Sequence, residues 1–234
     1  MLLTFLKKPS MFGSNMSLDL DIKKQIIVIG QKLAKRGMVA GSDGNISARL
    51  DKTHIVITAS GKAKGFLTVG DLVIVDMEGM VIEGNCQPSS ELAMHLAVYH
   101  KRPEINACVH AHPPYATSFA VVGIRLEKDI LPEVVVFVGA IPLIKYAPPG
   151  TEAVPEALAP HLEGNNAFLL SNHGLLTIGR TLEEAYQRHE TVEQYAKIVH
   201  LAHQLGEIRH IPAEDYSRLD ELRRQLEKYP SDND

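Results

Sequence analysis

The chain has 234 residues, of which 45% are hydrophobic and 22% are charged, a balance typical of a globular protein with a buried core. Its net charge of −4 comes without a basic run or an acidic block, which argues against nucleic-acid binding. No apolar run approaches the ~18 residues of a membrane-spanning helix. The two cysteines, Cys86 and Cys108, are too few for a disulfide framework. We therefore expect a cytoplasmic protein in which both thiols are small apolar fillers.

Residues 1–17 carry a short apolar patch followed by lysines, the reverse of the order in a signal peptide, and are expected to form a flexible extension. Residues 21–36 repeat apolar side chains at spacings of three and four, which predicts an amphipathic helix ending at Gly37. Residues 18–234 show no composition shift and no internal repeat. They are predicted to form a single domain with a C-terminal helical tail.

Short β-branched runs predict strands that are separated by turn residues. These strands are expected at residues 55–59, 72–76, near 106–112, at 134–138, 141–144, 167–170 and 175–178. Helices are expected from Ser89 to about His100, after Pro114, after Thr151, from a capping box at Thr181 and Glu184 to about Leu205, and in the tail. Several links between strands are short, which favours antiparallel pairing. The predicted fold class is α/β, with a mixed or largely antiparallel sheet covered by helices.

The sharpest chemical signal is the pair His110 and His112 in the run NACVHAHPP. On a strand these two residues point to the same face, so both imidazoles can bind one metal ion. A chance pair among 11 histidines is the ordinary alternative. His173 lies at a glycine-marked turn between two apolar runs and would supply a third nitrogen. Three protein ligands with one open position are typical of catalytic zinc, although imidazoles also bind cobalt, manganese or iron.

The run PSSE places Ser89, Ser90 and Glu91 at a predicted helix start. Simple capping explains these residues, and an anion site made of amides and hydroxyls is the functional alternative. Glu91 would then lie beside the bound anion as a candidate general base. Two glycine-bearing turns, residues 41–47 and 58–62, could complete an anion site, although each is also ordinary loop chemistry.

The motifs GNIS, TASG, PSSE, HAH and NHG follow one another in this order along the chain. Their order and spacing resemble the class II aldolase/adducin family, which contains L-fuculose-1-phosphate aldolases and L-ribulose-5-phosphate 4-epimerases, over about residues 20–205. The resemblance implies a three-layer α/β/α fold with a central, mainly antiparallel sheet and a homotetramer with sites near subunit interfaces. It assigns one Zn²⁺ per subunit to His110, His112 and His173. It assigns the phosphate of a small sugar substrate to Asn45, Ser60, Gly61, Ser89 and Ser90.

Glu91 matches the acid/base carboxylate of the aldolase branch, whereas the epimerase branch has an aspartate there. We therefore expect a zinc-dependent aldolase that cleaves a ketose 1-phosphate, similar to L-fuculose 1-phosphate, into dihydroxyacetone phosphate and a short aldehyde. The family's proton-donating tyrosine would fall near Leu131, where this chain has none. The replacement is left open among Tyr115, Tyr146, Tyr216 and Tyr229, as is the role of Glu133.

Four other functions remain as alternatives. Three share the site: a 4-epimerase, a dehydratase and a decarboxylase of sugar phosphates. A non-catalytic scaffold like the adducin head domain is the fourth, and the presence of all three histidines and Glu91 argues against it. A zinc hydrolase is disfavoured because no H-E-x-x-H motif accompanies the histidines.

Overall fold

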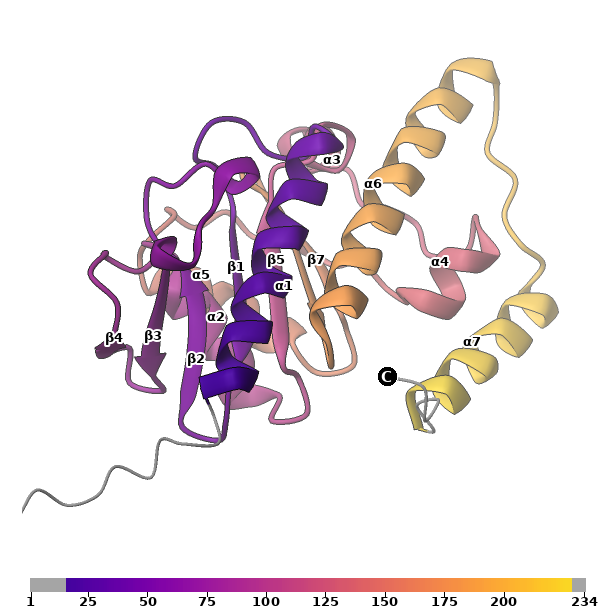
Figure 1. Ribbon diagram of the computed structural model, residues 1–234. Helices are drawn as coiled ribbons and strands as arrows, with labels where there is room; N and C mark the ends of the chain where they lie inside the picture. Colours follow the sequence, from indigo (N-terminus) through magenta and orange to yellow (C-terminus); the bar gives the residue numbers. More distant parts are fainter. Residues whose placement is uncertain (1–15, 229–234) are drawn as a thin grey trace, which may run out of the picture.

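The computed structural model describes residues 16–228, and an eight-stranded sheet lies at its centre (Figure 1). The strand order is β4-β3-β2-β1-β5-β8-β7-β6, and every neighbouring pair is antiparallel except β6 with β7. The predicted mainly antiparallel sheet is thus confirmed. The strands are β1 (Asn45–Arg49), β2 (His54–Thr58), β3 (Leu72–Asp76), β4 (Val81–Glu83), β5 (Ala107–Ala111), β6 (Leu143–Ile144), β7 (Ala167–Leu170) and β8 (Gly174–Gly179).

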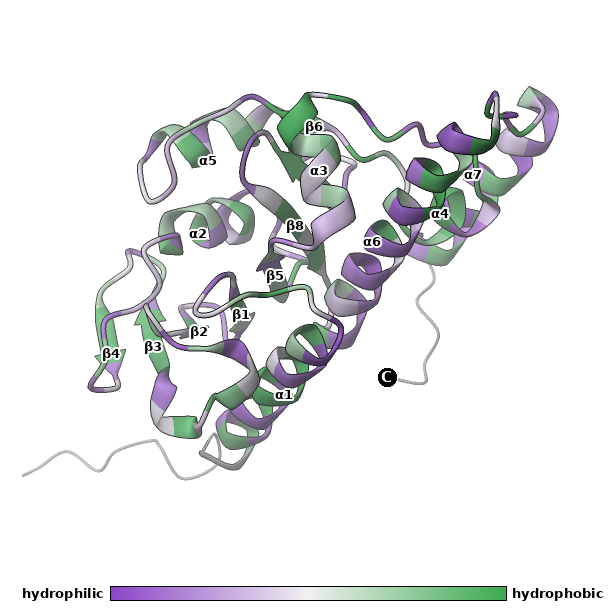
Figure 2. Ribbon diagram, turned by 90° about the horizontal axis from the view of Figure 1, so that it is seen from above, coloured by the Kyte–Doolittle hydropathy of each residue, from purple (hydrophilic) through white to green (hydrophobic). Residues whose placement is uncertain are grey.

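Helices cover both faces of the sheet, which makes a three-layer α/β/α arrangement (Figure 2). One face carries α2 (Leu92–Lys101) and α5 (Ala153–Leu158), and the other carries α1 (Met16–Lys35) and α6 (Leu182–Leu205). The remaining elements are α3 (Pro114–Val122), α4 (Pro132–Phe137), α7 (Ala213–Lys228) and the 3-10 turns Lys64–Phe66, Val69–Asp71 and Ala159–His161. No helix in this part of the chain is long and apolar enough to cross a membrane.

Side-chain alternation along β5 decides which residues face the site. Ala107 and Val109 pack into the core beneath α1 and α6, whereas Cys108 packs into the core beneath α2 and α5. His110 has the same parity as Cys108, so its imidazole points toward α2. Cys108 is fully buried and Cys86 is half-buried, and both are free thiols.

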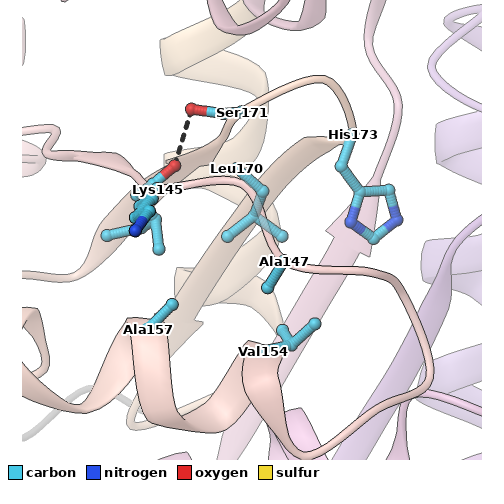
Figure 3. A pocket seen from close by; sticks show the side chains of 8 residues that line it. Lys145, Ala147, Val154, Ala157, Leu170, Ser171 and His173 are labelled. Atoms are coloured by element: carbon cyan, nitrogen blue, oxygen red, sulfur yellow. Dashed lines mark hydrogen bonds between the residues drawn. The ribbon is translucent and has the colours of Figure 1, made fainter.

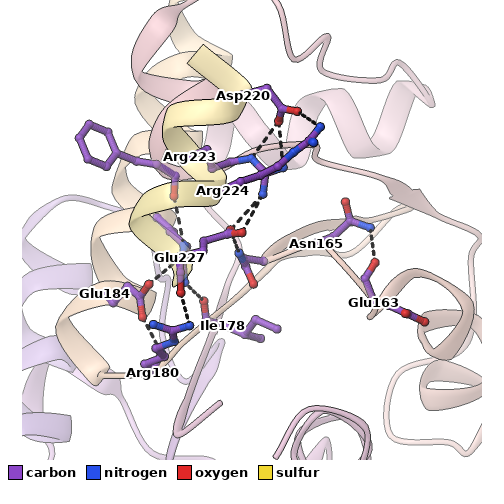
Figure 4. A network of polar contacts seen from close by, with 12 residues as sticks. Glu163, Asn165, Ile178, Arg180, Glu184, Asp220, Arg223, Arg224 and Glu227 are labelled. Atoms are coloured by element: carbon purple, nitrogen blue, oxygen red, sulfur yellow. Dashed lines mark hydrogen bonds and ion pairs between the residues drawn. The ribbon is translucent and has the colours of Figure 1, made fainter. Parts of the chain in front are cut away.

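The predicted capping signal of α6 is confirmed, and it lies beside the anchor of the C-terminal helix. Thr181 Oγ1 accepts a hydrogen bond from the Glu184 amide at 3.1 Å. The carboxylate of Glu184 accepts one from the amide of Arg180. Figure 4 shows how α7 attaches nearby: the Arg180 guanidinium donates to the carbonyl of Glu227, whose carboxylate pairs with Arg223 at 3.0 Å.

The prediction of a strand at residues 134–138 is wrong, because this segment forms α4. Pro132 stands in the first turn, where its missing N–H costs nothing. Val134 and Val138, one helical turn apart, are both buried in the core formed with α3 and α6. That packing outweighs the β preference of valine. The strand expected at 141–144 is also shorter than predicted, since only Leu143–Ile144 pair with β7.

Three further differences affect the ends and the turns. Residues 41–47 are not a single turn, because Asn45 begins β1 and pairs across the ladder with His110. The exposed edge strand β4 was not predicted from the sequence. Met16 and Ser17, assigned to the N-terminal extension, are the first residues of α1, and the rest of that predicted extension lies outside the described residues.

Candidate metal-binding active site

Three imidazoles from distant parts of the chain meet at one end of the sheet. His110 lies in β5 and His112 directly follows it, and their Nε2 atoms are 3.2 Å apart. His173 comes from the turn between β7 and β8, where Asn172 adopts a left-handed φ of 56°. The Nε2 atom of His173 lies 3.3 Å from that of His110. Each ring offers one nitrogen to a cluster whose members all lie within 4.8 Å of one another.

The surroundings of these rings fix the nitrogen atom that each one presents. His110 Nδ1 donates a hydrogen bond to the carbonyl of Leu175 at 3.0 Å, so its Nε2 keeps a free lone pair. His112 Nδ1 lies 3.5 Å from the carboxylate of Asp43. Burial lowers the pKa of His112, and burial together with the His110 ring lowers the pKa of His173 to about 4. Neutral rings with an outer partner on the far nitrogen are the usual state of metal-binding histidines.

The spacing of the rings fits a metal ion. A tetrahedral zinc ion about 2.0–2.1 Å from each nitrogen would hold its ligand atoms about 3.3–3.4 Å apart. The two Nε2 separations of 3.2 and 3.3 Å match that edge. The structure therefore brings together the three histidines that the sequence singled out, in an arrangement that can hold a divalent cation.

Gly174 allows the three rings to converge. A Cβ atom at this position would lie 2.6 Å from the carbonyl oxygen of Ala111 and 2.6 Å from Cδ2 of His112. It would also lie 3.3 Å from Cε1 of His110. Glycine is therefore required at the start of β8 because the backbone of β5 and the imidazoles occupy the space of a side chain.

Glu91 stands at the N-cap position of α2, where its side chain makes no capping hydrogen bond and instead faces the histidine cluster. Its two carboxylate oxygens lie 3.3 Å from the Nε2 atoms of His110 and His173. The side-chain amide of Asn45 donates to Oε2 at 2.8 Å, while Oε1 is buried without a hydrogen-bond partner in the described part of the chain. Burial alone would raise the pKa of Glu91. The His110 ring and the Asn45 hydrogen bond, together with His173, outweigh burial and hold this pKa well below its ordinary value.

Four of the five residues predicted to bind phosphate lie in two loops that are joined by backbone hydrogen bonds. The Ser60 amide donates to Gln87, and the Ser89 amide donates to the carbonyl of Thr58. The buried Ser89 hydroxyl accepts from the Glu91 amide at 3.3 Å. The side chains of Ser60 and Ser90 are exposed, as is Gly61, whose φ is +70°. Neither of these two hydroxyls has a hydrogen-bond partner among residues 16–228, so both are free to bind a ligand.

Asn45 has a different setting from the other predicted phosphate residues. It is 3% exposed, and its amide connects Glu91 on one side to His95 on the other. Sequence reasoning missed His95, which lies four residues after Glu91 on α2. It also missed Asp43 beside His112. The four-residue spacing from Glu91 was the available signal for His95.

A shallow pocket opens beside His173, between the end of β7, the segment after β6 and α5 (Figure 3). Lys145 and Ser171 lie on its polar side. A second hollow is lined by Ser90, Glu91 and the loop that precedes α5. Both hollows adjoin the site, so the segment from β6 to α5 borders the space next to the candidate metal ligands.

The described candidates for the missing tyrosine have other surroundings. The ring of Tyr115 lies against His200 on α6, and Lys128 lies over the ring of Tyr216. Tyr146 is 53% exposed, and Tyr229 lies outside the described residues. Glu133 is an exposed residue in the first turn of α4.

Comparison with known proteins agrees with this geometry. Residues 24–200 match the family described as class II aldolase and adducin N-terminal domain. An L-fuculose phosphate aldolase of Methanococcus vannielii is 39% identical over 76% of this chain and 95% of its own length. A 3-oxo-tetronate 4-phosphate decarboxylase of Haemophilus influenzae is 35% identical, covering 77% of this chain and 87% of its own. A solved L-fuculose 1-phosphate aldolase superposes with a TM-score of 0.82 at 35% identity, covering 89% of this chain and 98% of its own. The chain belongs to the class II aldolase and adducin family.

Proposed function

We propose that the protein is a metal-dependent aldolase that cleaves a ketose 1-phosphate to dihydroxyacetone phosphate and a short aldehyde. The observation that carries the proposal is the meeting of three imidazole Nε2 atoms with a buried carboxylate 3.3 Å away. The relatives named as sugar-phosphate aldolases support the reaction class. His110, His112 and His173 would hold the metal, with zinc as the proposed ion because three protein ligands and one open position are typical of catalytic zinc.

The metal, when bound, supplies Lewis-acid stabilisation of negative charge on the substrate's oxygen atoms. The chain's own residues handle the proton. In the cleavage direction, the hydroxyl on C4 loses a proton, the C3–C4 bond breaks to release the aldehyde, and C3 of the remaining fragment gains a proton. Glu91 is placed to carry this proton, because its Oε1 faces the histidine cluster without a hydrogen-bond partner.

The phosphate is proposed to bind to the exposed residues Ser60, Gly61 and Ser90. The buried residues Ser89 and Asn45 would support this site from the protein interior. This assignment is supported by the two free hydroxyls in loops held together by backbone hydrogen bonds. Phosphate binding away from the reacting bond would fix the position of the substrate's reacting atoms relative to Glu91 and the metal ligands. A carboxylate introduced by Ser90→Asp should repel the phosphate and raise KM, whereas Ser118→Asp on the exposed side of α3 should leave KM unchanged.

Glu91→Gln is the experiment that tests the proposal. The substitution keeps the size of the side chain but removes its capacity to accept a proton. Zinc content should stay at the wild-type level, while kcat for aldehyde release from L-fuculose 1-phosphate should fall by about 10² to 10⁴. An unchanged kcat would remove Glu91 from the reaction.

Decarboxylation is the second candidate, because the relative named as a 3-oxo-tetronate 4-phosphate decarboxylase is nearly as similar as the aldolases. Loss of CO2 leaves the same kind of negative charge on the remaining fragment, so the same residues could serve both reactions. Metal-loaded protein should be incubated with both substrate classes, with trapping of aldehyde and measurement of CO2. Release of CO2 without aldehyde would replace the aldolase assignment.

The homotetramer implied by the family resemblance is also proposed here. It is supported by exposed apolar side chains on α3, α4 and α6, including Phe137 at 60% and Leu205 at 90% exposure. Light scattering on the purified protein measures the assembly directly, and a monomer at micromolar concentration would contradict this proposal.

A further inference from the structure

A row of buried polar residues runs behind Glu91 and takes no part in the proposed reaction. Glu91 at the N-cap of α2 is followed within the helix by His95 and Tyr99 at intervals of four residues, and all three face the sheet. On β1, Asn45 and Ser47 are two residues apart and face α2. Four residues of a helix rise about 6.0 Å, and two residues of a strand rise about 6.6–6.8 Å. The side chains of the two rows are therefore spaced almost equally and can meet pair by pair.

The five side chains interlock in a single hydrogen-bonded chain that alternates between helix and strand. Tyr99 OH lies 2.7 Å from Ser47 Oγ, which lies 2.6 Å from His95 Nδ1. His95 Nε2 lies 2.5 Å from Asn45 Oδ1, and Asn45 Nδ2 lies 2.8 Å from Glu91 Oε2. Every link connects residues at least 46 positions apart in the sequence.

The orientation of the Asn45 amide fixes the direction of every hydrogen bond. Asn45 presents its NH2 group, which can only donate, to Glu91, and its carbonyl oxygen, which can only accept, to His95. His95 must then donate from Nε2, which leaves Nδ1 as an acceptor. Ser47 must donate to that Nδ1, and its oxygen is then free to accept from Tyr99. All donors therefore point toward the carboxylate.

The four side chains that lead to Glu91 in this hydrogen-bonded row are buried from solvent and uncharged. His95 and Ser47 are 0% exposed, Tyr99 is 2% exposed and Asn45 is 3% exposed. Burial lowers the pKa of His95 to about 3 and raises that of Tyr99, so neither ring is charged at neutral pH. Away from solvent, each group is oriented by its hydrogen-bonded neighbours, and the buried Cys108 thiol also lies against Ser47 and Tyr99, which makes this row of side chains rigid.

We propose that His95 is a positioning residue. Ser47 and Tyr99 hold its neutral ring in the Nε2–H tautomer, and this Nε2–H orients the Asn45 amide. The oriented amide then keeps Oε2 of Glu91 as a hydrogen-bond acceptor. Oε1, which has no partner in the described residues, is then the oxygen that exchanges the proton. The role of Oε1 rests on the proposed function, whereas the tautomer of His95 does not. Without this chain the Asn45 amide could turn over and present its oxygen to the carboxylate.

Paired substitutions of His95 separate positioning from simple packing. Gln places an amide nitrogen near the position of the imidazole Nε2, so His95→Gln can still donate to Asn45. His95→Asn is too short to do so. On metal-loaded protein, we expect kcat within about threefold of wild type for His95→Gln and about 10- to 100-fold lower for His95→Asn, with KM unchanged in both. His100→Gln, an exposed residue on the same helix, is the matched control and should behave as wild type.

The tautomer is measured without any substrate. Solid-state NMR of zinc-loaded protein labelled with ¹⁵N-histidine distinguishes Nε2–H from Nδ1–H, and the signal of His95 is identified by its loss in His95→Gln. We expect Nε2–H in the wild type and a mixture of tautomers in Ser47→Ala, which leaves Nδ1 without its donor.

An Nδ1–H signal in the wild type would overturn the inference, as would equal kcat values for His95→Gln and His95→Asn. If His95→Asn fails to fold, the NMR result and the kcat of Ser47→Ala, expected to fall about tenfold, decide the question. If no aldehyde is released by any protein while Nε2–H is observed, the proposed reaction fails and the positioning network remains.

Discussion

Replacing Gly174 by alanine should disrupt the metal site more than the fold. The new Cβ atom would lie 2.6 Å from Cδ2 of His112, whereas ordinary contact begins at 3.4 Å. Because the carbonyl oxygen of Ala111 would also lie 2.6 Å away, either the start of β8 must move by about 0.8 Å, or the His112 ring and the Ala111 backbone must both move by that amount. Either movement is several times the tolerance of about 0.2 Å in a metal–ligand distance. Zinc affinity should fall by about 10- to 100-fold.

The assay is competition for Zn²⁺ against a chromophoric chelator, with circular dichroism to follow the fold of the metal-free protein. Gly164→Ala is the control for a glycine-to-alanine change without a steric clash, because its φ of +75° strains alanine while an added Cβ would meet nothing within 4 Å. That variant should lose about 1 kcal/mol of stability and keep its zinc affinity. Wild-type zinc affinity in Gly174→Ala would refute the steric argument.

Two further predictions concern the support of the site and the C-terminal helix. Lys64 is 1% exposed, its Nζ donates to the carbonyls of Ser42 and Lys62, and burial lowers its pKa to about 8. Between about pH 8 and the unfolded value of about 10.4, the unfolded chain holds a proton that the folded chain has released, so folding becomes more favourable as pH rises. The stability of wild type relative to Lys64→Met, from urea titrations, should therefore increase across that interval, and a pH-independent difference would contradict the assignment. Glu227→Ala removes the hydrogen bond that Asn166 donates to the Glu227 carboxylate from outside α7, together with a partly exposed ion pair to Arg223 within the helix. It should therefore speed hydrogen exchange in α7 while changing global stability by less than about 1 kcal/mol. Unchanged exchange would show that other contacts anchor the helix.

Local sequence rules determined much of this protein. Periodicity predicted α1, and the Thr181–Glu184 pattern predicted α6 and the residue at which it begins. The i, i+2 spacing of His110 and His112 was enough to place both rings on one face, because strand geometry within two residues needs no tertiary information. The order of the motifs along the chain was sufficient to indicate the family.

Only the tertiary structure decided what surrounds these residues. The register of β1 on β5 sets Asn45 opposite His110, and the register of β8 on β5 brings the Leu175 carbonyl to the His110 ring. Whether the valines of α4 form a helix or a strand likewise depended on the core that they meet. These outcomes depend on contacts between residues tens of positions apart, where propensities and short motifs carry no information. The sequence therefore indicated the candidate site residues, and the packing of distant strands and α2 against one another gave each of them its partner and its orientation.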